Sequence, residues 1–78
     1  MNTVNKIMKP NQEIREEIRK YGLTYADLLP HIENYSHTTR IVEELALPLS
    51  FERQKVYLLA IKKAKEKKKK EFEELFKN

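Results

Sequence analysis

Only one glycine, Gly22, and three prolines interrupt the 78 residues of this chain. Turn-rich folds built from β-strands need more of both residues, because glycine and proline supply the backbone angles of tight turns. Between these breaks the chain is rich in glutamate, lysine and leucine, which have high helix propensities. The sequence therefore predicts an all-α fold.

The first predicted helix spans about residues 12–21. Asn11 precedes it as a candidate N-cap, and Gly22 follows it, where a helix commonly ends in a left-handed residue. Its apolar residues recur at i, i+4 and i+7, which places them on one face: Ile14, Ile18 and Tyr21.

A short second helix is predicted to begin after Thr24. Thr24 and Asp27 have the spacing of a capping box, in which each side chain accepts a hydrogen bond from a free backbone donor. Pro30 would remove a backbone hydrogen bond inside a helix and collide with the preceding turn. The second helix is therefore expected either to end near Leu29 or to be kinked, with Pro30 opening a fresh turn.

The third predicted helix spans about 36–46, with Ser36 as its N-cap. Its inner side would carry Thr38, Ile41, Val42 and Leu45. Its outer side would carry His37, Arg40, Glu43 and Glu44. Pro48 disfavours helical geometry at Leu47, so the helix ends there, and Leu47 and Leu49 are expected to be buried under the connection.

The fourth predicted helix begins after Ser50, another candidate N-cap. Its expected core face is formed by Phe51, Val56, Leu59, Ala60 and Ala64, with Tyr57 and Ile61 flanking it. The lysine-rich run at 65–70 favours helix but has no apolar face, so this helix is expected to project beyond the bundle. Three residues at helical spacing then form what we call the apolar tip: Phe72, Leu75 and Phe76.

Basic charge is concentrated at the two ends of the chain. Residues 1–22 carry a net charge of +2, residues 23–50 carry −3, and residues 51–78 carry +5. Together with the predicted helices, this division predicts a flexible N-terminal arm over 1–10, a helical domain over 11–64 and a charged C-terminal helical extension over 65–78.

No residue pattern indicates an enzyme, a metal site or a cofactor site. The chain has no cysteine, which excludes disulfides and thiolate ligands. A phosphate-binding loop needs several glycines, and metal-binding histidine pairs on a helix prefer i, i+4 spacing, whereas His31 and His37 are six residues apart. We therefore predict no catalytic residue, no metal and no cofactor.

The chain is expected to have no membrane partner and to be cytoplasmic. No apolar run approaches the roughly 20 residues of a membrane span. The N-terminus lacks the apolar stretch of a signal peptide.

The segment 23–46 predicts a short helix, a brief polar turn and a second helix. In DNA-binding helix pairs the second helix enters the major groove, and its first residues contact base edges. The candidate base contacts are His37, Thr38, Thr39 and Arg40, of which Arg40 can bind guanine through two hydrogen bonds. The alternative is that this segment is only a solvated helix start.

Phosphate contacts would come from basic side chains and from the backbone amides near Ser36, at a helix N-terminus. The candidates are Arg15, Arg19, Ser36, Lys62, Lys63, Lys65, Lys68 and Lys69, together with the rest of the run 65–70. The alternative for this run is a solvated helical tail, as charge runs usually are. The predicted partner is double-stranded DNA.

Two stretches resemble a known family. Residues 11–15 (NQEIR), with Ile18 and then 22–24 (GLT), resemble the opening of small prophage and mobile-element helix-turn-helix DNA-binding proteins of Gram-positive bacteria. Residues 49–53 (LSFER), followed by 59–61 (LAI), resemble the start of the final helix in that family.

The resemblance covers roughly 11–64. It implies a small DNA-binding regulator or accessory factor that reads DNA with a recognition helix at about 36–46. Together with the predicted helices, it implies a compact helix-turn-helix-like bundle of about four helices with a longer basic C-terminal helix.

A function from another class remains an alternative. The chain would then be a helical protein-interaction module, an inhibitor or adaptor encoded by a mobile element, without DNA binding. The acidic centre and the apolar tip would carry that binding, since an i, i+3, i+4 apolar set suits a groove. The tip is also a candidate surface for a homodimer.

Overall fold

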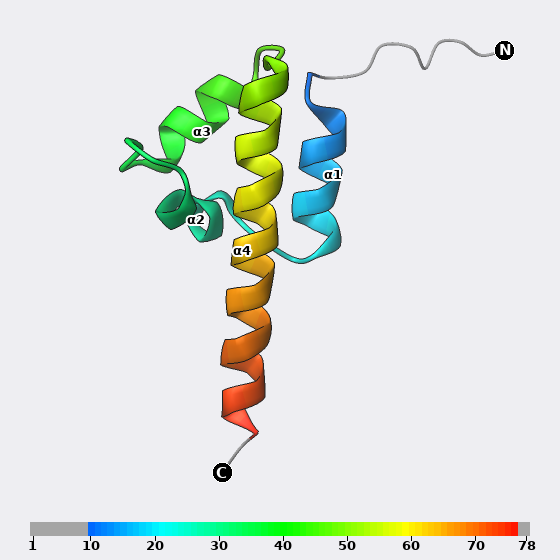
Figure 1. Ribbon diagram of the computed structural model, residues 1–78, viewed down its shortest axis with the longest axis vertical. Helices are drawn as coiled ribbons and strands as arrows, with labels where there is room; N and C mark the ends of the chain where they lie inside the picture. Colours follow the sequence, from blue (N-terminus) through cyan, green and yellow to red (C-terminus); the bar gives the residue numbers. More distant parts are fainter. Residues whose placement is uncertain (1–9, 77–78) are drawn as a thin grey trace, which may run out of the picture.

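The computed structural model describes residues 10–76. Within this range the elements are α1 (Gln12–Lys20), α2 (Tyr25–Leu28), the 3₁₀ turn η2 (Leu29–His31), α3 (Thr38–Leu45) and α4 (Phe51–Leu75). Residues 10–76 contain no strand, so the predicted all-α class is confirmed (Figure 1). The predicted arm over 1–10 lies, apart from Pro10, outside the described residues.

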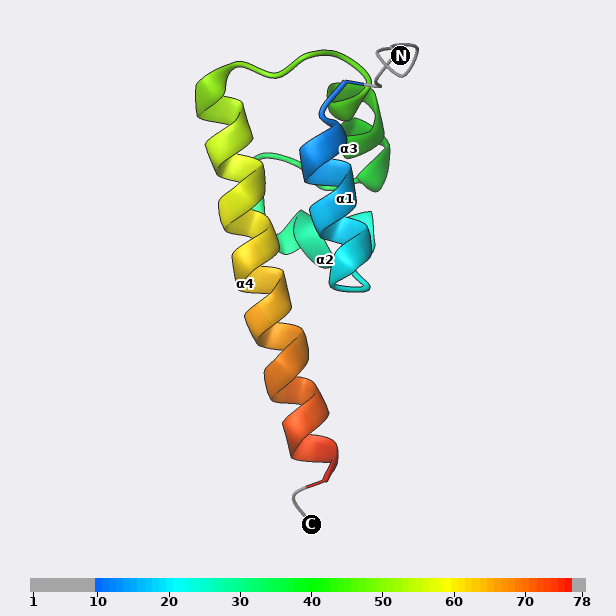
Figure 2. The same ribbon diagram turned by 90° about the vertical axis from the view of Figure 1, so that its right-hand side faces the viewer.

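The long helix α4 organises the bundle. One side of α4 packs against α1, and α2 with η2 packs against another side, while α3 packs against α2 (Figure 1). Turned by 90°, the molecule shows the connection from α3 to α4 crossing over one end of the bundle (Figure 2). The C-terminal part of α4 runs well past α1 and α2, as the sequence predicts.

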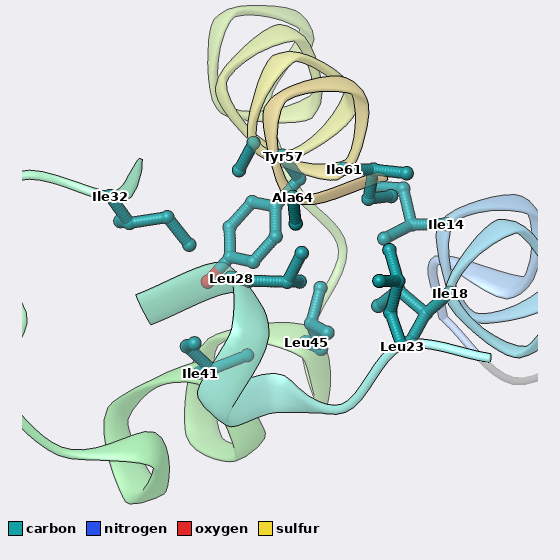
Figure 3. Close-up of a cluster of buried hydrophobic side chains, with 11 residues drawn as sticks. Ile14, Ile18, Leu23, Leu28, Ile32, Ile41, Leu45, Tyr57, Ile61 and Ala64 are labelled. Atoms are coloured by element: carbon teal, nitrogen blue, oxygen red, sulfur yellow. The ribbon is translucent and has the colours of Figure 1, made fainter. Parts of the chain in front are cut away.

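The core is formed where the four helices meet (Figure 3). Tyr57, Leu28, Ile41 and Leu45 are its largest fully buried side chains. The other buried apolar residues are Ile14, Ile18, Leu23, Ile32, Ala60, Ile61 and Ala64. Burying these side chains is the main force that holds α1, α2 and α3 on α4, at about 25 cal/mol per Å² of apolar surface.

Three of the predicted helix boundaries are confirmed. Thr24 and Asp27 form the expected capping box, and the Ser50 hydroxyl accepts a hydrogen bond from the Arg53 amide at 3.2 Å. Gly22 has φ +65°, so it adopts the left-handed conformation that ends α1.

The break at Pro30 combines both predicted outcomes. The α-helix ends at Leu28, and Pro30 then lies within the 3₁₀ turn η2. A 3₁₀ turn accommodates Pro30 because its φ is close to the angle that the proline ring imposes. Asn34 follows with φ +70°, so asparagine supplies a left-handed position before α3.

Two predicted N-caps are wrong. Asn11 is left-handed, with φ 61°, and its side chain makes no cap; its amide donates instead to the carbonyl oxygens of Leu45 (3.0 Å) and Leu47 (2.8 Å). Ser36 also does not cap α3, whose N-cap position is His37, without a side-chain hydrogen bond. Asn11 thus joins the start of α1 to the end of α3.

The buried faces predicted for α3 and α4 are also wrong in part. In α4, Phe51 and Leu59 are exposed and Tyr57 is fully buried, because the bundle packs on the face that Tyr57 shares with Ala60, Ile61 and Ala64. Leu59, two residues after Tyr57, points away from that face. Val42 and Leu47 are likewise exposed, while Thr38 and Leu49 are half-buried.

Candidate nucleic-acid interface

The first turn of α3 lies at the surface. Ile41 and Leu45 are fully buried on the inner side of α3 and fix the helix against the bundle. The preceding polar residues lie on the other side or before the helix: Ser36, His37, Thr39 and Arg40 are exposed, and Thr38 is half-buried. The structure therefore brings the four predicted base contacts together in one turn, with only Thr38 partly covered.

Arg40 is oriented by two neighbours. Its guanidinium lies over the Tyr35 ring, 5.1 Å from the ring centroid. Its Nε is 3.9 Å from a carboxylate oxygen of Glu43, and its side chain remains 60% exposed. Stacking on an aromatic ring restricts the orientation of a guanidinium, while its N–H donors stay accessible to a binding partner.

A polar cluster beside α3 holds the helix in place. The Glu44 carboxylate accepts hydrogen bonds from the hydroxyls of Tyr35 and Tyr57, both at 2.7 Å. Arg53 of α4 donates to it from Nε at 2.6 Å and from Nη2 at 2.8 Å. The cluster links the loop before α3, α3 itself and α4.

The hydrogen bonds in this cluster shift the pKa values of its members. Those from Arg53, more than those from the two tyrosines, lower the pKa of Glu44 from 4.5 to about 2. Burial, and next its hydrogen bond to Glu44, raises the pKa of Tyr57. The hydrogen bond to Glu44 is the main cause that raises the pKa of Tyr35. Glu44 is therefore ionised, and both tyrosines are neutral, near pH 7.

Two of the predicted phosphate contacts are engaged within the chain. Arg15 donates to the carbonyl oxygens of Pro10 (3.1 Å) and Leu45 (3.0 Å). The Lys68 ammonium lies 3.1 Å from the Gly22 carbonyl oxygen and 3.2 Å from the Asp27 carboxylate. Both side chains stabilise contacts between helices.

The remaining predicted phosphate contacts are spread around the molecule. Arg19, Lys62, Lys63 and Lys69 are exposed, as is Ser36. Lys65 is half-buried, with its ammonium 4.2 Å from the centroid of the Tyr21 ring. Lys65, Lys68 and Lys69 line a shallow depression with Tyr21 and Phe72, beside α1. The structure does not gather these three lysines near α3.

A second depression lies on α4 beside η2. Lys63, Lys67 and Lys70 line it with His31 and Glu66. The His31 Nε2 atom is buried and has no hydrogen-bond partner. The sequence did not predict that His31 lies beside these lysines. The spacing of Lys63, Lys67 and Lys70, at i, i+4 and i+7, does place the three lysines on one face of the helix.

No three His, Asp or Glu side chains among residues 10–76 are gathered as a metal ion would need. None of the helices within that range combines the length and the apolar character required to cross a bilayer. Comparison of the chain with protein-family models, with curated proteins and with solved structures found no match.

Proposed function

We propose that this chain binds double-stranded DNA, as a small regulator or accessory factor, with the first turn of α3 at the base edges. The observation that carries the proposal is the exposure of this turn on a helix whose opposite side is anchored in the core. His37, Thr38, Thr39 and Arg40 are the base contacts, as in the helix-turn-helix proteins that the sequence resembles.

Arg40 provides the most specific contact in this proposal. A guanidinium donates two parallel hydrogen bonds to O6 and N7 of guanine. Stacking on Tyr35 limits its side-chain freedom before binding, which lowers the entropy lost on contact. The connection from η2 to α3, residues 32–37, is longer than the three or four residues that join the two helices of a standard helix-turn-helix. The proposal therefore rests on the exposure of the first turn of α3, and not on the geometry of this connection.

Phosphate contacts are assigned to the part of α4 that lies beside η2. Lys63, Lys67 and Lys70 surround the depression next to η2, and their charges suit a phosphate backbone. Backbone amides after Ser36 add the positive end of the α3 dipole. Arg15 and Lys68 are excluded from this role, since both serve contacts between helices.

A mobility-shift titration tests the proposal. The preferred duplex is first selected from a random library with the wild-type chain, and binding is then compared with a scrambled duplex. Arg40→Ala should weaken binding to the selected duplex about tenfold or more and to the scrambled duplex much less. Arg40→Lys is the matched control, because it keeps the charge and loses the paired donors.

Two outcomes contradict the proposal. One is the absence of binding to any duplex at low salt, where phosphate contacts are strongest. The other is an equal loss on the selected and scrambled duplexes for Arg40→Ala, which would make Arg40 a charge contact only.

A second candidate function is protein binding, and the apolar tip favours it. Phe72, Leu75 and Phe76 are 60%, 74% and 73% exposed, and a contiguous exposed apolar patch marks an interaction surface. Capture from nuclease-treated lysate tests this candidate. A protein retained by the wild-type chain and lost with Phe72→Ser and Leu75→Ser would support it, and equal retention would count against it.

A further inference from the structure

A third depression, which we call the apolar depression, lies at the end of the bundle where α1 and α4 begin. The connection from α3 to α4 crosses over this end (Figure 2). The depression is lined by Pro10 and the first residues of α1, by Pro48 and Leu49 of the connection, and by Gln54 and Leu58 of α4. Its volume is about 370 Å³, which is within the size range of ligand-binding pockets. None of the proposed DNA contacts lines it.

Apolar side chains in and around this depression are open to solvent. Leu58 is 48% exposed and Leu49 is half-buried, so both present apolar atoms to the depression. Leu47, directly before Pro48, is 66% exposed, and Phe51, two helical turns before Leu58, is 68% exposed. Exposed apolar residues gathered in this way mark an interaction surface. This end of the bundle is therefore suited to bind an apolar segment.

The chain carries such a segment directly before Pro10. Residues 4–9 contain three apolar side chains and two lysines: Val4, Ile7 and Met8, and Lys6 and Lys9. Because a chain extends by at most about 3.6 Å per residue, Ile7 and Met8 stay within about 11 Å of Pro10. Pro10 itself lines the apolar depression, so both side chains can reach it without crossing the bundle.

We infer that residues 4–9 bind in the apolar depression of the same chain, with Ile7 and Met8 against Leu49 and Leu58. Covering the two leucines removes apolar surface from water, which favours binding. The two lysines match the charge of the rim, where Glu13 is exposed. The tether favours this occupant over a separate molecule, because a short linker holds the segment at an effective concentration in the millimolar range. This bound segment replaces the flexible arm that the sequence predicts over 1–10.

Disulfide trapping in the full chain tests the inference, because the chain has no cysteine of its own. The test variant carries Ile7→Cys and Leu58→Cys, and the matched control carries Ile7→Cys and Leu59→Cys. Leu59 is exposed to nearly the same degree, 52%, but is not among the residues that line the depression. Under mild oxidation, the test variant should form its intramolecular disulfide at least tenfold faster than the control, since a disulfide needs its two Cα atoms within about 7 Å.

Two results of this trapping would overturn the inference. One is an equal rate of closure in the test and control variants, which would show that the segment has no preference for the depression. The other is a disulfide formed mainly between two chains at about 10 μM protein, well below the effective concentration of the tethered segment. The segment of one copy would then occupy the depression of another. The experiment contains no DNA, so its outcome and that of the mobility-shift titration are independent.

Removing the apolar side chains of the segment gives a second measurement. Ile7→Ser combined with Met8→Ser should lower the folding equilibrium constant at least tenfold, because two apolar side chains no longer cover the depression. Urea denaturation followed by circular dichroism measures this constant. Asn2→Ser combined with Asn5→Ser is the matched control and should change it less than twofold, since both side chains are polar. A variant without Ile7 and Met8 that is as stable as the wild type would also overturn the inference.

Discussion

Arg53 of α4 binds Glu44 of α3 side-on, with Nε 2.6 Å from Oε2 and Nη2 2.8 Å from Oε1. The Glu44 side chain is only 18% exposed, so the pair is shielded from much of the solvent. The hydroxyls of Tyr35 and Tyr57 complete the contacts of the carboxylate. Because α3 carries the proposed base contacts, this cluster sets how the first turn of α3 is presented.

Removing the carboxylate should destabilise the fold. Glu44→Ala leaves Arg53 and two tyrosine hydroxyls without their acceptor, at an expected cost of about 2 kcal/mol in the free energy of unfolding. Urea denaturation followed by circular dichroism measures this change. Glu43→Ala is the matched control, because Glu43 lies on the same helix with an exposed side chain and should change stability by less than about 0.5 kcal/mol. Equal effects of the two variants would contradict the role of the cluster.

The same carboxylate predicts a pH dependence. The pKa of Glu44 is lowered from 4.5 to about 2 in the folded chain, so its stabilisation is fully present above pH 4.5 and is lost as the pH falls toward 2. The stability difference between the wild type and Glu44→Gln should therefore be about 1 to 2 kcal/mol at neutral pH and shrink toward zero near the folded-state pKa.

Urea denaturation of both proteins at several pH values measures that difference. The pKa of Asp27 is also lowered, chiefly by the hydrogen bond from the Thr24 amide. Asp27 is present in both proteins, so its contribution cancels. A difference that stays constant between neutral and acidic pH would show that the charge of Glu44 does not stabilise the fold.

Local signals in the sequence predicted three of the helix boundaries correctly, although the caps at Asn11 and Ser36 were wrong. The box formed by Thr24 and Asp27, the Ser50 cap and the left-handed Gly22 each depend on residues within three positions of one another. Such short-range chemistry can be identified without knowledge of the fold.

Contacts between helices could not be predicted in the same way. Six consecutive residues at 56–61 of α4 are apolar, so every side of the helix has apolar candidates, and the packing of α1 and α2 selects the Tyr57 side. The pairing of Glu44 with Arg53 likewise depends on how α3 and α4 meet. The exposure of the proposed base contacts was predicted, whereas the stacking of Arg40 on Tyr35 was not.

Asn11 stands at a helix start that the sequence predicted, but its contacts with the end of α3 were not predicted. These contacts give another testable prediction. Its left-handed backbone directs its amide to the carbonyl oxygens of Leu45 and Leu47. Asn11→Gly keeps the backbone conformation and loses both hydrogen bonds, at about 1 to 2 kcal/mol. Asn11→Ala loses the bonds and adds roughly 1 kcal/mol of backbone strain. Urea denaturation should rank the wild type above Asn11→Gly and Asn11→Gly above Asn11→Ala, and a glycine variant as stable as the wild type would contradict the account.

The central claim is that the first turn of α3 contacts DNA bases. Titration of the isotopically labelled full chain with duplex DNA, followed through backbone amide chemical shifts, tests it most directly. The account predicts the largest shifts at 36–40, smaller shifts around Lys63, Lys67 and Lys70, and loss of the shifts at 36–40 in Arg40→Ala. Shifts confined to the end of α4, or no shifts at low salt, would contradict it.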